Sequence, residues 1–213
     1  MKLLAVGDSF TRGDELTNLA YAWPDLLAQQ LNCSLTNLGA GGASNTKILS
    51  NAVEHISEHD IIVVAWSHFD RTELADEDGV YDLWPGRVNI PNVNKFPWRK
   101  SIGDYNSRYH NDTYLYKQYL INVILFQSLA QVNNKKYVML DAFGNNVELR
   151  NNKEFSSFVK QIDTRYFIGW PNETMMEWVG NAPKGPRGHF LEFGHKQVAD
   201  KIYEHIGNLG WLP

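Results

Sequence analysis

The sequence contains a single cysteine, no long hydrophobic run and no surplus of basic residues. Cys33 alone can form neither an internal disulfide nor a metal site built from cysteines. No apolar run approaches the ~18 residues that a membrane-spanning helix needs, so we expect no membrane partner. The 20 basic and 24 acidic side chains give a net charge of −4, which offers no general attraction for nucleic-acid phosphates.

The start of the chain lacks the pattern of an export signal. Only residues 1–6 precede Gly7-Asp8-Ser9, and this stretch is too short for a signal peptide. The absence of an export signal and the single thiol together predict a cytoplasmic protein.

Aromatic residues are abundant, with seven tryptophans, ten tyrosines and ten phenylalanines among 213 residues. This content excludes disorder as the main state, and the length predicts one domain over residues 1–213. Many of the aromatic residues lie between Tyr81 and Tyr116, largely within a proline-containing insertion at about residues 71–111.

Apolar runs alternate with helical patterns along the rest of the chain. Strands are predicted at residues 2–6, 34–38, 61–66 and 137–140, and helices at 23–31, 45–56, 112–132 and 193–206. This alternation predicts an α/β fold with a mostly parallel sheet covered by helices on both faces. Residues 71–111 and 144–188 do not fit the repeat, although a short helical piece is expected at 153–162.

Ser9 and His189 are the residues best placed for catalysis. Ser9 follows the first predicted strand, where its hydroxyl would lie at the edge of the sheet that carries reactive groups in such folds. The simpler alternative is that Asp8 and Ser9 only form a turn or a helix cap. His189 lies in a loop before the last helix and is the candidate general base, whereas His195 is expected to be structural.

Four short segments together match a known family. They are Gly7-Asp8-Ser9-Phe10, Ala22-Trp23-Pro24-Asp25-Leu26-Leu27, Asn37-Leu38-Gly39-Ala40-Gly41-Gly42, and His189 with Gly194-His195. In this order they resemble the sequence blocks of the SGNH or GDSL-type hydrolases, over residues 2–45 and 188–206.

The resemblance implies a flavodoxin-like three-layer α/β/α sandwich and a serine esterase that uses no cofactor. Ser9 would be the nucleophile that forms an acyl-enzyme, and His189 would be its base. The backbone N–H groups of Ser9 and Gly42 would contribute to the oxyanion hole.

Two positions depart from the family pattern. Phe69 stands where the family has the asparagine of its oxyanion hole, so Ser67 or His68 could donate instead, or could merely end the strand. Pro186 stands where the family has the aspartate that orients the histidine.

The identity of the acid therefore stays open. Glu192, three residues after the histidine, and Asp141, at a strand end, are the alternatives, and neither has further support in the sequence. A backbone carbonyl or a distant carboxylate could also orient the histidine.

Other kinds of site fit the sequence poorly. Asp8, His68, Asp70, His189 and His195 include no His-x-x-x-His pair on a helix, so no metal centre is expected. The glycines at 39–42 lack the spacing and the lysine of a phosphate-binding loop.

We expect the substrate to be a small acyl ester, first of all an acetyl ester as in a deacetylase, carried by a small molecule or a carbohydrate. The side chains expected to contact it are Asp8, Phe10, Trp66, Asp70 and Arg71. Some rings of the aromatic segment are expected to form a wall over Ser9. Transfer to a sugar hydroxyl would make the protein an O-acetyltransferase, and a scaffold weakened by the two departures would act as a binding module. Both alternatives stay open, as does the oligomeric state.

Overall fold

The structure is a computed structural model that describes all residues except 78, 85–109, 145–148, 150 and 213. Its centre is a five-stranded sheet in which every pair of neighbouring strands is parallel. The strands, in their order across the sheet, are β2 (Ser34–Gly39), β1 (Lys2–Gly7), β3 (Ile61–Trp66), β6 (Lys136–Asp141) and β7 (Phe167–Ile168).

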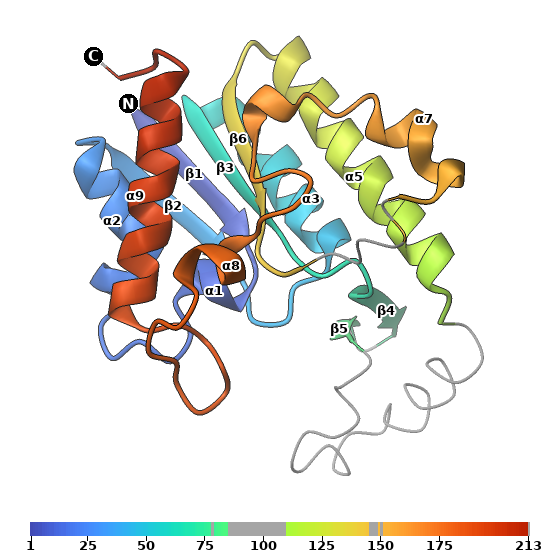
Figure 1. The fold of residues 1–213 in the computed structure, drawn as a ribbon, viewed down its shortest axis with the longest axis horizontal. Coiled ribbons are helices and arrows are strands. Elements are labelled where there is room, and N and C mark those ends of the chain that lie inside the picture. The colour runs from blue at the N-terminus through green and yellow to red at the C-terminus, as the bar shows by residue number, and fades with distance from the viewer. Residues whose placement is uncertain (78, 85–109, 145–148, 150, 213) are drawn as a thin grey trace.

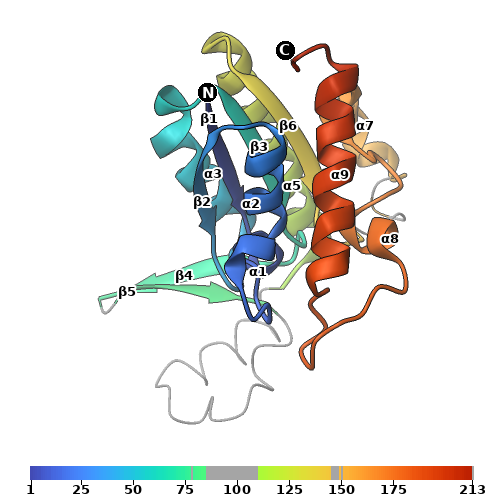
Figure 2. The same ribbon diagram turned by 90° about the vertical axis from the view of Figure 1, so that its left-hand side faces the viewer.

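Helices cover both faces of the sheet, as Figures 1 and 2 show. One face carries α2 (Trp23–Gln30), α8 (Met175–Val179) and α9 (Glu192–Asn208), and the other carries α3 (Asn45–His55) and α5 (Asp112–Val132). Successive side chains of a strand point to opposite faces, so Ala65 packs under α2 and α9 while Trp66 packs under α3 and α5. The predicted three-layer α/β/α fold is confirmed.

Local sequence signals explain where the main elements begin. Every residue of β3 is buried, as its unbroken apolar run predicts for a strand covered on both faces. Pro24 lies in the first turn of α2, where its missing N–H costs nothing. Ser44 caps α3 by accepting a hydrogen bond from the N–H of Lys47, and Asn111 caps α5 in the same way.

The smaller elements lie mostly between these. They are α1 (Ser9–Arg12), α7 (Ser156–Val159), the 3-10 turns Leu19–Tyr21, Ile56–Glu58, Lys153–Phe155 and Thr164–Tyr166, and the antiparallel pair β4 (Thr72–Asp76) and β5 (Gly79–Leu83). The β4–β5 hairpin opens the predicted insertion, whose residues 85–109 lie outside the described part of the chain. No helix of the described residues is long and apolar enough to cross a membrane.

The parallel sheet brings the chain segments that follow its strands to one edge. Gly7 of β1 pairs with Gly39 of β2, and Trp66 of β3 pairs with Asp141 of β6. The loops beyond these four residues therefore lie side by side, which is where open α/β sheets place their ligand sites.

Candidate active site

Ser9 begins the four-residue helix α1 immediately beyond β1. Asp8 caps this turn because its carboxylate accepts a hydrogen bond of 3.0 Å from the N–H of Phe10. The turn is tight enough to require glycine before it, since a Cβ on Gly7 would lie 2.1 Å from Oγ1 of Thr11. Asp8 therefore does form the helix cap that the simpler interpretation of the sequence allowed, and the same cap holds Ser9 at the edge of the sheet.

His189 reaches Ser9 from the far end of the chain. Its Nε2 lies 2.9 Å from Oγ of Ser9, within hydrogen-bond distance. The imidazole is largely buried and packs against the ring of Phe10, with the ring centroids 4.8 Å apart. The structure thus brings together the two residues that the sequence suggested as nucleophile and base.

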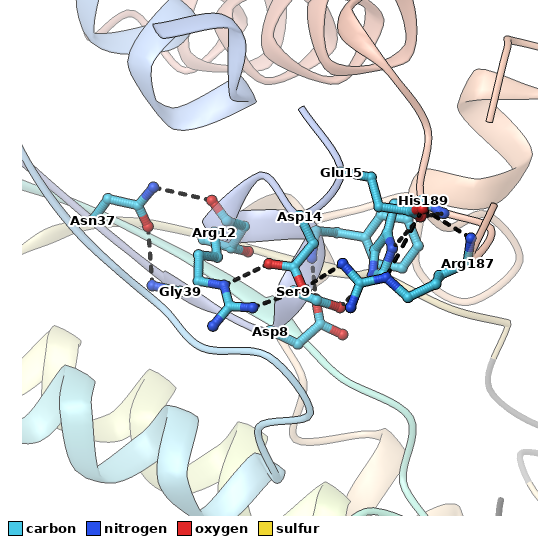
Figure 3. Close-up of polar contacts among 11 residues, drawn as sticks. Asp8, Ser9, Arg12, Asp14, Glu15, Asn37, Gly39, Arg187 and His189 are labelled. Atoms are coloured by element: carbon cyan, nitrogen blue, oxygen red, sulfur yellow. Dashed lines mark hydrogen bonds and ion pairs between the residues drawn. The ribbon is translucent and has the colours of Figure 1, made fainter. Parts of the chain in front are cut away.

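Glu15 places a carboxylate beside His189 that the sequence did not reveal. Its Oε2 lies 2.8 Å from Nδ1 of His189, on the side of the ring opposite Ser9. The same carboxylate accepts hydrogen bonds from the N–H of His189 at 3.1 Å and from the N–H of Arg187 at 2.9 Å (Figure 3). Ser9, His189 and Glu15 therefore form one hydrogen-bonded chain, the arrangement of a serine hydrolase triad.

The hydrogen bonds to Glu15 keep its carboxylate ionised. Burial acts to raise the pKa of Glu15, but the hydrogen bonds from Arg187 and His189 outweigh it and lower the pKa below its usual value. A charged carboxylate on Nδ1 favours the tautomer in which Nε2 accepts the proton of Ser9.

The two carboxylates considered from the sequence lie elsewhere. Asp141 is buried at the end of β6, where it accepts a hydrogen bond of 2.7 Å from the hydroxyl of Tyr119. Glu192 starts α9 and contributes to a surface pocket beside α2. The only sequence signal for Glu15 was its place six positions after Ser9, combined with the lack of any carboxylate between Glu177 and His189.

A pocket of about 680 Å³ lies over Ser9. Its wall includes Phe10, Gly42, Arg71 and His189, which the sequence had selected, and Trp84 from the aromatic segment. The remaining lining residues are Arg12, Asp14, Gly41, Phe143, Met176, Arg187 and Gly188. The pocket is of the size that small-molecule sites usually have.

Gly42 lies against the indole of Trp84 on the wall of this pocket. Its φ of 78° is in the left-handed region, and a Cβ would lie 2.6 Å from the indole of Trp84, so both conformation and contact require glycine. The N–H groups of Ser9 and Gly42 have no hydrogen-bond partner among the described residues, so both are available to a ligand.

Five residues selected from the sequence do not line the pocket, namely Asp8, Trp66, Ser67, His68 and Asp70. Trp66 is fully buried under α3 and α5, and Oγ of Ser67 donates a hydrogen bond of 3.1 Å to Asp8. Nδ1 of His68 pairs with Asp70 at 2.6 Å. Asp8 itself lies beneath Ser9, fully buried.

Arginines and Asp14 line the pocket beside the triad. Arg12 donates from Nη2 to Asp14 at 2.7 Å, and Nη2 of Arg187 lies 3.9 Å from the same carboxylate, as Figure 3 shows. On the other side of α1, the amide of Asn37 accepts from the N–H of Gly39 and donates to the carbonyl of Thr11, which joins α1 to β2. The turn that carries Ser9 is therefore held from both sides.

His195 is structural, as expected. It is fully buried, and its Nδ1 accepts a hydrogen bond of 3.1 Å from the N–H of Trp23 at the start of α2. Burial, together with the nearby His189, lowers the pKa of His195 to about 3, so the ring is neutral. Among the described residues, no three His, Cys, Asp or Glu side chains come together as metal ligands.

The fold is that of the SGNH or GDSL-type hydrolases. The esterase EstA from Pseudoalteromonas sp. matches with a TM-score of 0.56 at 15% identity, over 98% of this chain and 97% of its own. A putative lipolytic protein of the G-D-S-L family from Desulfitobacterium hafniense matches with a TM-score of 0.52 at 13% identity, over 96% and 98%. The acetyl xylan esterase Est2A from Butyrivibrio proteoclasticus matches with a TM-score of 0.56 at 15% identity, over 99% of this chain and 64% of that enzyme.

The chain belongs to a family of unknown function, DUF6071, whose model matches residues 9–211. A comparison with curated proteins found no match.

Proposed function

We propose that the protein is a serine esterase that hydrolyses small acyl esters through an acyl-enzyme on Ser9. The observation that carries this proposal is the continuous hydrogen-bonded chain from Ser9 through His189 to Glu15 on the wall of a pocket. A protein that only binds a ligand has no need of such a chain, which argues against the binding module.

The geometry supports a two-step reaction. Oγ of Ser9 attacks the ester carbonyl while Nε2 of His189 takes its proton, and the carbonyl electron pair moves onto oxygen. The pair returns as the bond to the alcohol breaks, and His189 gives its proton to the leaving oxygen. Water then attacks the acyl-enzyme in the same way and releases the acid and free Ser9. Glu15 stays ionised throughout and stabilises the imidazolium.

The oxyanion that forms at each attack needs hydrogen-bond donors. The N–H groups of Ser9 and Gly42, which have no partner among the described residues, are two backbone donors available on the pocket wall. Their placement agrees with the roles that the family resemblance implies for these two residues.

The lining favours a small acyl group on an alcohol with a flat apolar face. Phe10, Phe143 and Met176 give the pocket an apolar side, and the indole of Trp84 forms a further wall. A sugar ring stacks well on such an indole, so an acetyl ester on a carbohydrate is the substrate that we propose. The acetyl xylan esterase among the similar structures supports this choice. Water is the proposed acceptor, and transfer to a sugar hydroxyl is the alternative outcome.

Hydrolysis of a neutral aryl acetate, combined with labelling by a fluorophosphonate, tests the proposal. The wild type is expected to turn over the ester and to be labelled at Ser9, whereas Ser9→Ala should show neither. Ser50→Ala, on the exposed side of α3, is the matched control and should behave as the wild type. Unchanged turnover in Ser9→Ala would refute the proposal.

A further inference from the structure

The segment after β3 does not place its expected oxyanion donors on the pocket. Phe69 is 5% exposed and packs edge-on against Tyr116, with the ring centroids 5.7 Å apart. Ser67 is buried with its hydroxyl on Asp8, and His68 is paired with Asp70. The family resemblance implies a side-chain donor here in addition to the N–H groups of Ser9 and Gly42, and none of these three side chains supplies it to the pocket.

Arg71 is the residue of this segment that lines the pocket. Its Nη1 donates to Oδ2 of Asp8 at 3.1 Å, and its side chain is 14% exposed. The guanidinium also lies over the ring of Phe143 at 4.9 Å and 5.8 Å from the ring centroid of Trp84. These contacts hold the guanidinium in one place before any substrate binds.

Asp8 is a fixed anchor for this arginine. The carboxylate is fully buried and also accepts hydrogen bonds from the N–H of Phe10 and the hydroxyl of Ser67. Because Asp8 directly precedes Ser9 in the chain, the ion pair ties the guanidinium to the turn that carries the nucleophile. The remaining N–H groups of the guanidinium have no hydrogen-bond partner among the described residues, and none of them is a fully buried polar atom without a partner.

We propose that Arg71 is the side-chain donor of the oxyanion hole, acting with the N–H groups of Ser9 and Gly42. This inference rests on the proposed esterase function. As Oγ of Ser9 bonds to the carbonyl carbon, one unit of negative charge develops on the carbonyl oxygen. A free N–H of the guanidinium donates to that oxygen, and the charge returns to the carbonyl when the leaving group departs. A charged donor is stronger than the neutral amide of an asparagine, and its planar fork can serve Asp8 and the oxyanion together.

Arg71→Ala and Arg71→Lys test the role with a neutral aryl acetate. For Arg71→Ala we expect kcat to fall by about 10² to 10³ with little change in KM, since the donor acts on charge present only in the transition state. Added guanidinium ion should restore part of the kcat of Arg71→Ala. Arg165→Ala is the matched control, because Arg165 is an exposed arginine paired with Asp163 outside the pocket, and it should leave kcat unchanged.

Arg71→Lys keeps a cation beside Asp8, and it tests the role of Arg71 in the oxyanion hole if Arg71→Ala does not fold. Its kcat should fall at least about tenfold, because the ammonium lacks the second arm of the fork. A kcat equal to that of the wild type in either folded variant would overturn the inference. The inference would also be overturned if the Arg71 variants kept the wild-type kcat and showed a higher KM only for anionic esters, because Arg71 would then bind a negatively charged group of the substrate. Loss of activity in Ser9→Ala but not in the Arg71 variants would refute this inference alone, whereas full activity in Ser9→Ala would refute the esterase proposal.

Discussion

Replacement of Glu15 by glutamine is the sharpest test of how His189 is oriented. The two carboxylate oxygens of Glu15 accept three hydrogen bonds, from the N–H of Arg187 and from the N–H and Nδ1 of His189. Glutamine keeps the shape of the side chain but has a single acceptor oxygen. Either orientation of its amide therefore leaves an NH₂ group facing a donor.

The two orientations have different consequences. If the amide oxygen faces His189, the tautomer is kept, but the charge that stabilises the imidazolium is lost and the N–H of Arg187 has no acceptor. If the NH₂ faces His189, it favours a proton on Nε2, and that ring cannot accept the proton of Ser9. From these effects we expect kcat to fall by about 10² to 10⁴.

The assay is steady-state hydrolysis of a neutral aryl acetate, with a thermal unfolding scan to show that each variant is folded. Glu192→Gln is the matched control, because Glu192 lines a surface pocket beside α2 and is not among the polar partners of the His189 ring in the described structure; its kcat should equal that of the wild type. A folded Glu15→Gln variant with wild-type kcat, in an enzyme that Ser9→Ala inactivates, would refute the assignment of Glu15.

Three further predictions concern the neighbourhood of the triad. Burial lowers the pKa of His195 from 6.5 to about 3, so as the pH falls the imidazole takes up a proton in the unfolded chain before it does in the folded protein. The neutral buried ring therefore contributes fully to the free energy of unfolding above pH 6.5, and this contribution is lost as the pH falls toward 3. When urea unfolding is measured at pH 6.5 and again at about pH 5, the free energy of unfolding of the wild type should fall by about 2 kcal/mol more than that of His195→Gln. An equal fall in both proteins would contradict a buried neutral ring. Gly42→Ala should lower kcat by about 10², because the methyl group meets the indole of Trp84 and displaces the N–H donor; an unchanged kcat would count against the oxyanion role. Trp84→Ala should raise KM for an acetylated sugar by about fivefold, the equivalent of a stacking contact worth about 1 kcal/mol. An unchanged KM would contradict stacking of the sugar on the indole of Trp84.

The sheet and its large helices could be predicted because their signals are local. The apolar run at residues 61–66 and the proline at the start of α2 determine burial and helix entry without reference to the rest of the chain. The hairpin β4–β5 and the two-residue strand β7 were not predicted, because they are short and lie in segments rich in turn-forming residues.

The candidate site was predictable only in part. Ser9 and His189 stand in recognisable segments, whereas Glu15 contacts a histidine 174 positions away and has no motif of its own. Trp66 was expected among the substrate contacts, but strand alternation turns its side chain to the face under α3 and α5. Whether a carboxylate or an indole reaches a pocket depends on the packing of distant segments, and a single sequence does not encode that locally.

The central claim is that Ser9 carries the acyl group during turnover. Rapid acid quenching of the wild type with an aryl acetate, followed by intact-mass and peptide analysis, measures this directly. We predict an acetyl group on the peptide that contains Ser9, formed as fast as the first equivalent of the alcohol is released and absent from Ser9→Ala. Turnover by the wild type with no acyl group at Ser9, together with undiminished turnover by Ser9→Ala, would contradict the claim.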